Sequence, residues 1–365
     1  MTVYLMAGTL LLLVLIQAWV PYFVRTTEVF GIYVPEPYSQ DAMLLKMKKR
    51  YAIVIGIAGS AAVLGYLAAF SRSSVPEEAA ALWGIGLQFG LLLFSMALYL
   101  SNHFKVKEEK RLRQWTAGKK EKVVVDLDFR KDLQMVSGIA FLLPMVITGG
   151  LIFYTWINYA SLPLQIPVHW GPGGEPDRFT EKSIFTGLSL PLVLLVMQVM
   201  FYSFNRSIKG SGAKIRASSR KRSRERELVS RKYGSLLLFI VSISSTLLLA
   251  CLQLSIIHQE MGSALWIMGA SVSFLILVLG AVAVYAVKVV KSGAGVEEVP
   301  ADPGIMDAND DRVWKAGIFY FNREDPSLMV EKRFGIGWTI NFGNPRSWLL
   351  LLLPLAILFG IAFAI

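Results

Sequence analysis

Long apolar runs separated by polar connectors set the pattern of this chain. A transmembrane helix needs about 20 mainly apolar residues to cross roughly 30 Å of hydrocarbon. Eight segments meet this requirement: 3–23, 52–70, 81–100, 135–157, 184–204, 234–257, 264–287 and 348–365. Because backbone polar groups in lipid must pair within their own segment, each is expected to be a helix. The pattern predicts an all-α integral membrane protein with about eight transmembrane helices.

The composition favours a membrane protein over a soluble one. Of 365 residues, 54% are hydrophobic and only 17% are charged, which is more apolar residue than a soluble core requires. The single cysteine, Cys251, lies inside an apolar run, which excludes a disulfide framework and a cysteine-based metal site. The first apolar run follows no Lys or Arg and is too long for a secretory signal, so it is expected to be retained.

The placement of Lys and Arg predicts the orientation of the chain. Four connectors, 25–51, 103–134, 205–233 and 288–347, carry 5, 10, 11 and 8 basic residues, which is 34 of the 37. They alternate with connectors 71–80, 158–183 and 258–263, which carry one, two and none. The positive-inside rule then predicts that the basic connectors lie in the cytoplasm and that both termini lie outside.

The net charge of +11 raises the question of nucleic acid. The most basic run, 209–232, is tethered at both ends by predicted spans and has no aromatic residues interleaved for base stacking. We therefore expect the lipid bilayer and anionic lipid headgroups at the basic connectors to be the partners, with no direct nucleic-acid binding. Further candidate partners are an extracytoplasmic peptide and a cytoplasmic regulator.

The last connector differs in composition from the others. A Gly, Pro, Val and acidic linker (291–304) precedes two aromatic runs, 314–321 and 334–342, which flank the turn-like sequence NREDPS. This predicts a small β-hairpin-like cytoplasmic module that docks against the membrane face before the last helix. Its candidate residues are Trp314, Phe319, Tyr320, Arg333, Phe334 and Trp338, and none of them suggests catalysis.

The chain is thus divided into five regions. These are a three-span region (1–134), a helix pair around an extracytoplasmic loop (135–204, loop 158–183), a basic connector with two spans (205–287), the linker and aromatic module (288–347), and the last span (348–365).

The loop at 158–183 is the best candidate for function. It contains LPLQIPVHWGPGGEPDRFTEKS, whose candidate residues are Pro163, Ile166, Pro167, His169, Trp170, Gly174, Pro176 and Asp177. The GPGG sequence predicts a tight turn with positive φ. His169 with Glu175 and Asp177 could hold a divalent cation or act as a general base. A single imidazole favours instead a folded turn, in which Asp177 caps backbone amides and Arg178 pairs with Glu175. Recognition of a peptide or small molecule is the functional alternative.

Other chemistry is disfavoured by what the spans and connectors lack. The spans contain essentially no ionisable residues, which weighs against a proton-coupled transporter and an intramembrane protease. No P-loop, dinucleotide fingerprint, HExxH or GxSxG stands in a plausible context. We therefore expect no enzyme, no cofactor and no metal ion.

The loop resembles the LPxxIPxHWxxxGxPDxxxxK signature of a domain of unknown function found in SdpI-type membrane proteins of Gram-positive bacteria. FGIYVPEP (30–37) is similar to an FGxRxP stretch of related proteins, with Tyr33 where Arg is common, and 310–345 resembles a second uncharacterised domain. The resemblance implies immunity to a secreted peptide toxin, and also sequestration of a transcriptional repressor at the membrane. We expect immunity to, or sensing of, an envelope-acting peptide. A permease or export-system component is the alternative, and an envelope hydrolase using His169 comes third.

Overall fold

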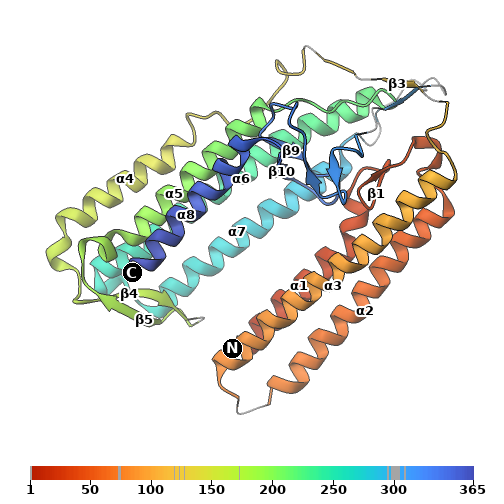
Figure 1. The fold of residues 1–365 in the computed structure, drawn as a ribbon. Helices are drawn as coiled ribbons and strands as arrows, with labels where there is room; N and C mark the ends of the chain where they lie inside the picture. Colours follow the sequence, from red (N-terminus) through yellow and green to blue (C-terminus); the bar gives the residue numbers. More distant parts are fainter. Residues whose placement is uncertain are drawn as a thin grey trace.

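The structure is a computed structural model that describes residues 2–72, 75–118, 120–122, 124–126, 128–171, 173–293, 296, 305–307 and 310–365. Most of the predicted linker 291–304 therefore lies outside the described residues. Eight α-helices occur within the described chain (Figure 1). They are α1 (Thr2–Phe23), α2 (Ala42–Phe70), α3 (Glu77–Leu112), α4 (Leu142–Ile157), α5 (Ile184–Gly210), α6 (Arg220–Ile257), α7 (Ala264–Lys291) and α8 (Pro345–Phe363).

Seven of these helices are long and apolar enough to cross a membrane, and α4 is shorter. The predicted fourth span at 135–157 is therefore corrected, because helix α4 begins only at Leu142 and has 16 residues. At 1.5 Å per residue it extends about 24 Å, less than the roughly 30 Å of hydrocarbon. Pro144 explains the late start, since proline is tolerated in the first turn of a helix and not in its interior.

The helices form two groups. The first contains α1, α2 and α3, and the second contains α4 to α8, with α5 and α6 at its centre (Figure 1). Small residues bring the first group together: a Cβ on Gly59 of α2 would lie 2.3 Å from Val14 of α1, and one on Gly84 of α3 would lie 2.9 Å from Met6. Such close approach is typical of helices that pack within a membrane.

Hydrogen bonds between helices join the second group. The Gln198 amide of α5 donates to Thr148 of α4 at 2.7 Å and to Thr246 of α6 at 2.9 Å. The Gln253 amide of α6 donates to Thr155 of α4 at 3.2 Å and to the Gly187 carbonyl of α5 at 3.0 Å. These two glutamines and their threonine and carbonyl partners therefore hold α4, α5 and α6 in register.

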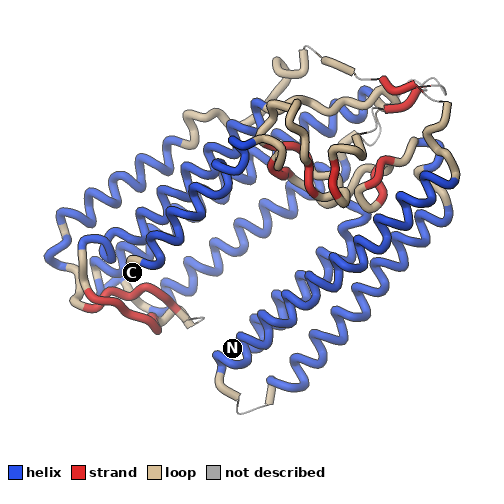
Figure 2. The backbone as a smooth tube through the Cα atoms, viewed as in Figure 1, coloured by secondary structure: helices blue, strands red, loops and turns tan. Residues whose placement is uncertain are grey.

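Short strands lie at the two ends of the helices, as Figure 2 shows. Both chain termini and the pair β4 (Gln165–Trp170) and β5 (Pro176–Glu181) are at one end, which we call the hairpin end. The other strands and the basic connectors are at the opposite end, which we call the connector end. Those strands are β1 (Glu28–Val29), β2 (Ile32–Tyr33), β3 (Lys120–Lys122), β6 (Ile305–Asp307), β7 (Trp314–Lys315), β8 (Phe319–Tyr320), β9 (Met329–Glu331) and β10 (Trp338–Ile340). The separation of basic from non-basic connectors thus matches the two ends of the fold.

The expected single hairpin of the C-terminal module is wrong in detail. Strand β7 pairs with β8, and β9 pairs with β10, so each hairpin turns within or beside one aromatic run. The NREDPS sequence links the two hairpins instead of forming a hairpin turn. The first turn uses Ala316 and Gly317, both at positive φ, which a short antiparallel connection requires.

The hairpin at β4 and β5 is a further difference, because the sequence predicted only a folded loop there. The 3₁₀ turns η2 (Tyr159–Ser161) and η3 (Gln259–Met261) lie beside it, after α4 and α6 respectively, and η1 (Glu36–Tyr38) precedes α2. The fold is therefore helical with small strand pairs at both ends of the bundle.

Candidate functional site

The signature residues build a two-stranded antiparallel hairpin that rests on the ends of α6 and α7. The Gly171 N–H donates to the Glu175 carbonyl at 2.8 Å and closes the turn. Gly174 has a φ of +80°, which confirms the predicted positive-φ turn. A Cβ at this position would lie 2.4 Å from the Ala264 carbonyl oxygen, so glycine also lets the turn approach the start of α7.

The base of the hairpin is fixed by burial and by one lysine. Leu162 and Ile166 are buried against Ile256 and Ile257 at the end of α6. The Lys182 ammonium donates to the carbonyls of Ala160 and Leu162 at 3.1 and 2.8 Å. Of the signature residues, the buried Ile166 and the charged Lys182 therefore have structural roles.

A groove of about 260 Å³ lies between this hairpin and the α6–α7 turn. We call it the hairpin groove. Its hairpin wall is made mainly of proline and aromatic side chains: Pro163, Gln165, Pro167, Trp170, Pro176 and Phe179. Ser255, Ile256, Gln259, Gly262 and Ile267 form the other wall. Rigid apolar walls beside the open edges of a two-stranded sheet suit an extended peptide, which can bind by strand addition and place side chains in pockets.

His169 and Asp177 form a pair across the two strands. The Nδ1 atom of His169 lies 2.5 Å from the Asp177 carboxylate, and the two side chains are 61% and 52% exposed. The expected role of Asp177 as a cap for backbone amides is thus replaced by this contact. The expected Arg178–Glu175 ion pair is not among those of the described residues. Within the same residues, no group of three His, Cys, Asp or Glu side chains is placed to hold a metal ion.

The aromatic candidates of the C-terminal module pack in separate contacts at the connector end. Phe334 lies between the β1–β2 turn and α3, with ring centroids 6.3 Å from Phe30 and 4.1 Å from Tyr99. The Trp338 ring lies 5.2 Å from the Arg231 guanidinium of α6. These residues attach the module to both helix groups.

The other module candidates form a second contact set. Trp314 packs on Tyr320 with ring centroids 5.1 Å apart, and the Lys214 ammonium lies 4.3 Å from the Tyr320 ring. Phe319 is half exposed and meets Phe342 edge to face. These side chains thus pack within the module and against Lys214.

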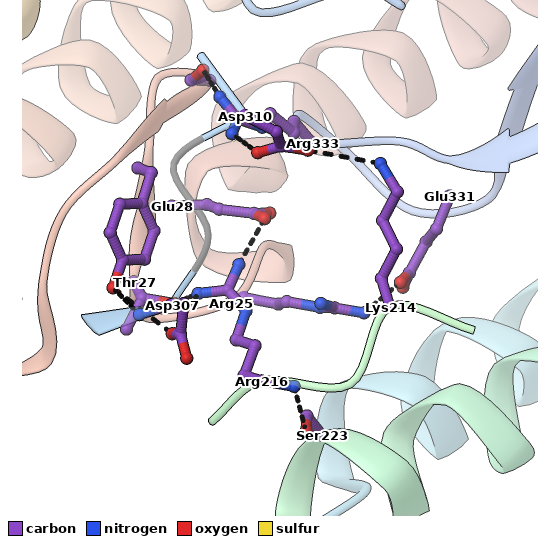
Figure 3. Close-up of polar contacts among 12 residues, drawn as sticks. Arg25, Thr27, Glu28, Lys214, Arg216, Ser223, Asp307, Asp310, Glu331 and Arg333 are labelled. Atoms are coloured by element: carbon purple, nitrogen blue, oxygen red, sulfur yellow. Dashed lines mark hydrogen bonds and ion pairs between the residues drawn. The ribbon is translucent and has the colours of Figure 1, made fainter. Parts of the chain in front are cut away.

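An extensive network of charged residues, which the sequence did not predict, joins the connectors at this end (Figure 3). We call it the polar junction. Its members come from five separate segments: Arg25, Glu28, Lys110, Lys214, Arg216, Glu227, Arg231, Asp307, Asp310, Asp311, Glu331 and Arg333. Buried charges of both signs are paired here, as burial requires.

The contacts of two arginines show how the junction links the two helix groups. Arg25, just after α1, pairs with both Glu227 of α6 and Glu331 of β9. Arg333 pairs with Asp310 and Asp311. It also donates to the Gly31 carbonyl of the β1–β2 turn at 3.1 Å. Burial alone would raise the pKa of the Asp310 carboxyl, but the charges of Arg333 and Lys214 outweigh it and lower that pKa to about 2.

A sequence signal for part of the junction did exist. Glu227 stands four residues before Arg231 in the run RERELVSR, which is the spacing of neighbours on one helix face. In the structure the two side chains are 1% exposed, and they pair at 2.8 Å. The more distant pairs depend on tertiary contacts and have no local signal.

Comparisons with known proteins match two parts of the chain. Residues 140–195, which include the hairpin, match a domain of unknown function (DUF1648), and 323–348 match a family of unknown function (DUF5808). The chain is also similar to an uncharacterised protein of Archaeoglobus fulgidus, with 32% identity over 60 residues, or 14% of this chain. That match spans 32% of the relative's length. No solved structure matches the chain.

Proposed function

We propose that this chain is a non-enzymatic, multi-pass membrane protein whose hairpin groove recognises an envelope-acting peptide, as an immunity or sensing protein does. The observation that carries the proposal is the groove itself. Four residues of the segment that resembles the SdpI-type signature, Pro163, Pro167, Trp170 and Pro176, line it together with Phe179, and this wall is open to an extended peptide. The membrane setting is supported by seven long apolar helices.

The proposed orientation places the hairpin groove outside the plasma membrane of a bacterium. All four basic connectors belong to the opposite end of the helices, and an excess of Lys and Arg marks the cytoplasmic side. Both termini then lie outside, with the hairpin. A peptide arriving from the envelope would therefore meet the groove before it reaches the bilayer.

Helix α6 supports sensing as well as binding. Its last residues, Ser255 and Ile256, line the hairpin groove, and its first third carries Glu227 and Arg231 of the polar junction. A single helix of 38 residues thus connects the proposed binding site with the C-terminal module. A cytoplasmic regulator that binds the module would be the partner through which peptide binding is read out.

A permease or export-system component is the alternative. It is favoured by a cavity of about 720 Å³ between the two helix groups, whose lining includes residues of α1, α3 and α7. The lining is mainly apolar, so a hydrophobic solute suits it better than an ion. Uptake or release of such a solute by proteoliposomes, at rates above protein-free vesicles, would support this alternative.

The test of the proposed function is sensitivity of cells to a broad panel of envelope-acting peptides. Cells lacking the gene should become sensitive to at least one peptide, and the intact gene should restore resistance. Phe179→Ala, at a groove side chain that is 50% exposed, should lose this protection at normal protein abundance. Trp266→Ala is the matched control, because this side chain is 57% exposed at the same end but lies outside the groove lining.

Unchanged sensitivity across the whole panel would refute the proposal. Equal loss of protection in Phe179→Ala and Trp266→Ala would also count against the groove as the site. For the hydrolase alternative, His169→Ala should abolish protection while leaving the protein folded and abundant. Reduced abundance of that variant would instead identify the His169–Asp177 pair as structural.

A further inference from the structure

Two cavities adjoin in the crevice between α1 and α7, near the connector end. One, of about 420 Å³, is lined by the residues that follow α1, by the first turn of α6 and by the end of α7. We call it the arginine cup. The other is the apolar cavity of about 720 Å³ described above. Phe23 lines both of them, so they meet at the end of α1.

The arginine cup has the chemistry of a phosphate site. Its lining carries four arginines, Arg25, Arg216, Arg222 and Arg226, and one carboxylate, Glu36. Carboxylates outside the lining hold three of these arginines in place: Glu227 and Glu331 pair with Arg25, Glu28 pairs with Arg216, and Glu331 pairs with Arg226. It also contains the start of α6, where the N-cap residue Ser219 makes no side-chain capping bond. Backbone N–H groups at the start of a long helix attract anions, and guanidinium groups bind phosphate oxygens in pairs.

Two observations indicate that the cup still has donors to offer. Arg226 has only 14% of its side chain exposed; its Nε faces the Glu331 carboxylate at 3.8 Å, beyond hydrogen-bond distance, and its Nη2 donates to the Phe23 carbonyl at 3.4 Å. Arg25 is held by Glu227 and Glu331 through Nη2 alone within the described chain. An arginine has five N–H donors, so both side chains are held in position and keep donors for a ligand.

The apolar cavity continues from the cup toward the middle of the helices. Along α1 its lining runs back from Phe23 through Val20 to Ile16, and along α7 it runs from Ala286 to Val282. The cup takes the adjoining parts of the same two elements, Val24 and Arg25 after α1 and Val290 of α7. Polar donors and an apolar cavity thus follow each other along α1 and α7, as the headgroup and the acyl chain do in a lipid.

Charge also decides which amphiphile fits. The headgroup part of the crevice is lined by four guanidinium groups and one carboxylate. A zwitterionic choline lipid would bring a cation to a site already rich in cations, whereas an anionic headgroup would not. A volume of several hundred Å³ is typical of ligand sites.

We propose that the crevice between α1 and α7 binds one anionic phospholipid, with its phosphate in the arginine cup and an acyl chain in the apolar cavity. The lipid belongs to the leaflet at the connector end and joins the two helix groups where they diverge. This inference needs the proposed membrane setting but does not depend on peptide recognition at the hairpin groove, which lies at the opposite end.

The experiment is native mass spectrometry of the purified full-length protein in detergent, titrated with phosphatidylglycerol or phosphatidylcholine of the same acyl chains. Wild type should retain one phosphatidylglycerol in preference to phosphatidylcholine. Arg222→Gln should weaken that binding about fivefold, as expected for one cation near a lipid headgroup. Lys221→Gln is the matched control, because Lys221 is exposed in the same helical turn but outside the cup lining.

A second pair of variants tests the acyl-chain part. Ala286→Trp should fill the apolar cavity and abolish retention, whereas Ala283→Trp, outside the lining on α7, should not. Size-exclusion profiles identify any misfolded variant, in which case the Arg222 and Lys221 pair still decides.

Three outcomes would overturn the proposal. One is equal retention of the two lipids by wild type, and another is equal binding by Arg222→Gln and Lys221→Gln. The third is retention that glycerol phosphate or inorganic phosphate displaces fully while Ala286→Trp has no effect, because the site would then hold soluble phosphate. Peptide protection is measured separately, so failure here leaves the proposed function standing.

Discussion

The ion pairs of Arg333 are expected to stabilise the C-terminal module more than those of any other single residue in it. Its side chain is 4% exposed, it pairs with Asp310 and Asp311, and it donates to the Gly31 carbonyl at 3.1 Å. Replacing it by methionine keeps much of the side-chain volume and removes the charge. Breaking a buried ion pair from one side typically costs about 3–5 kcal/mol, because the partner charge is left buried.

The structure places the expected cost at the lower end of that range. Without Arg333, Asp311 still has Lys110 at 2.6 Å and Asp310 still has Lys214 at 3.3 Å. We therefore expect Arg333→Met to lower the opening free energy of the module by about 3 kcal/mol, or roughly 100-fold in the opening equilibrium. Arg333→Lys should recover only part of this, since an ammonium cannot bind two carboxylates and a carbonyl in one plane.

Hydrogen exchange of the full-length protein in detergent, read by mass spectrometry over residues 310–342, measures this quantity directly. Arg323→Met is the matched control, an exposed arginine in the same module without an ion pair among the described residues. It should change protection by less than about 0.5 kcal/mol. If Arg333→Met exchanged within twofold of wild type, the polar junction would not be what holds the module in place.

Three further outcomes test other parts of the fold. Gly31→Ala should destabilise the protein strongly in thermal denaturation, because the φ of Gly31 is +74° and the new Cβ would lie 2.7 Å from the Gly317 Cα. Gly335→Ala is the control: its φ is +87°, but its Cβ would meet open space, so it should cost only about 1 kcal/mol. Gln253→Leu should lower resistance to SDS unfolding by about 0.6–1.7 kcal/mol, the range for interhelical hydrogen bonds in membranes, and no change would mean that this bond is dispensable. The pKa of Asp310 is lowered to about 2, so its stabilisation is present above its unfolded pKa of roughly 4 and is lost as pH falls toward 2. Asp310→Asn should therefore flatten the fall of thermal midpoint between about pH 4 and pH 2, and an unchanged pH profile would contradict the assignment.

The sequence predicted those features that depend on local pattern. Apolar run length located the long helices, because lipid-facing segments must be apolar along their whole length. The same criterion failed at α4, where run length did not reveal that the chain before Leu142 is not helical. Positive φ at Gly174 was predictable from the turn sequence. The strands beside it were not predicted, since QIPVHW carries two features, proline and proximity to a span, that favour a loop.

The polar junction could not be predicted, for a different physical reason. A basic connector that sets topology and one that pairs with buried acids have the same local composition. Only the fold decides that Arg25 meets Glu331, which is 306 positions away, and that Arg216 meets Glu28 at 2.5 Å. The acidic residues within basic connectors were the unused signal, because topology alone does not require them.

The positions of the two proposed sites indicate that the long helices α6 and α7 couple them. The hairpin groove is lined by the end of α6 and the start of α7, and the arginine cup is lined by the start of α6 and the end of α7. Both helices therefore contact both sites, and α6 and α7 pack against each other along the bundle. A peptide that shifted the α6–α7 turn would move the same helices at the cup, and by linkage a lipid bound there would alter the affinity of the groove. Binding of peptide and lipid should thus depend on each other even though the sites lie at opposite ends of the protein.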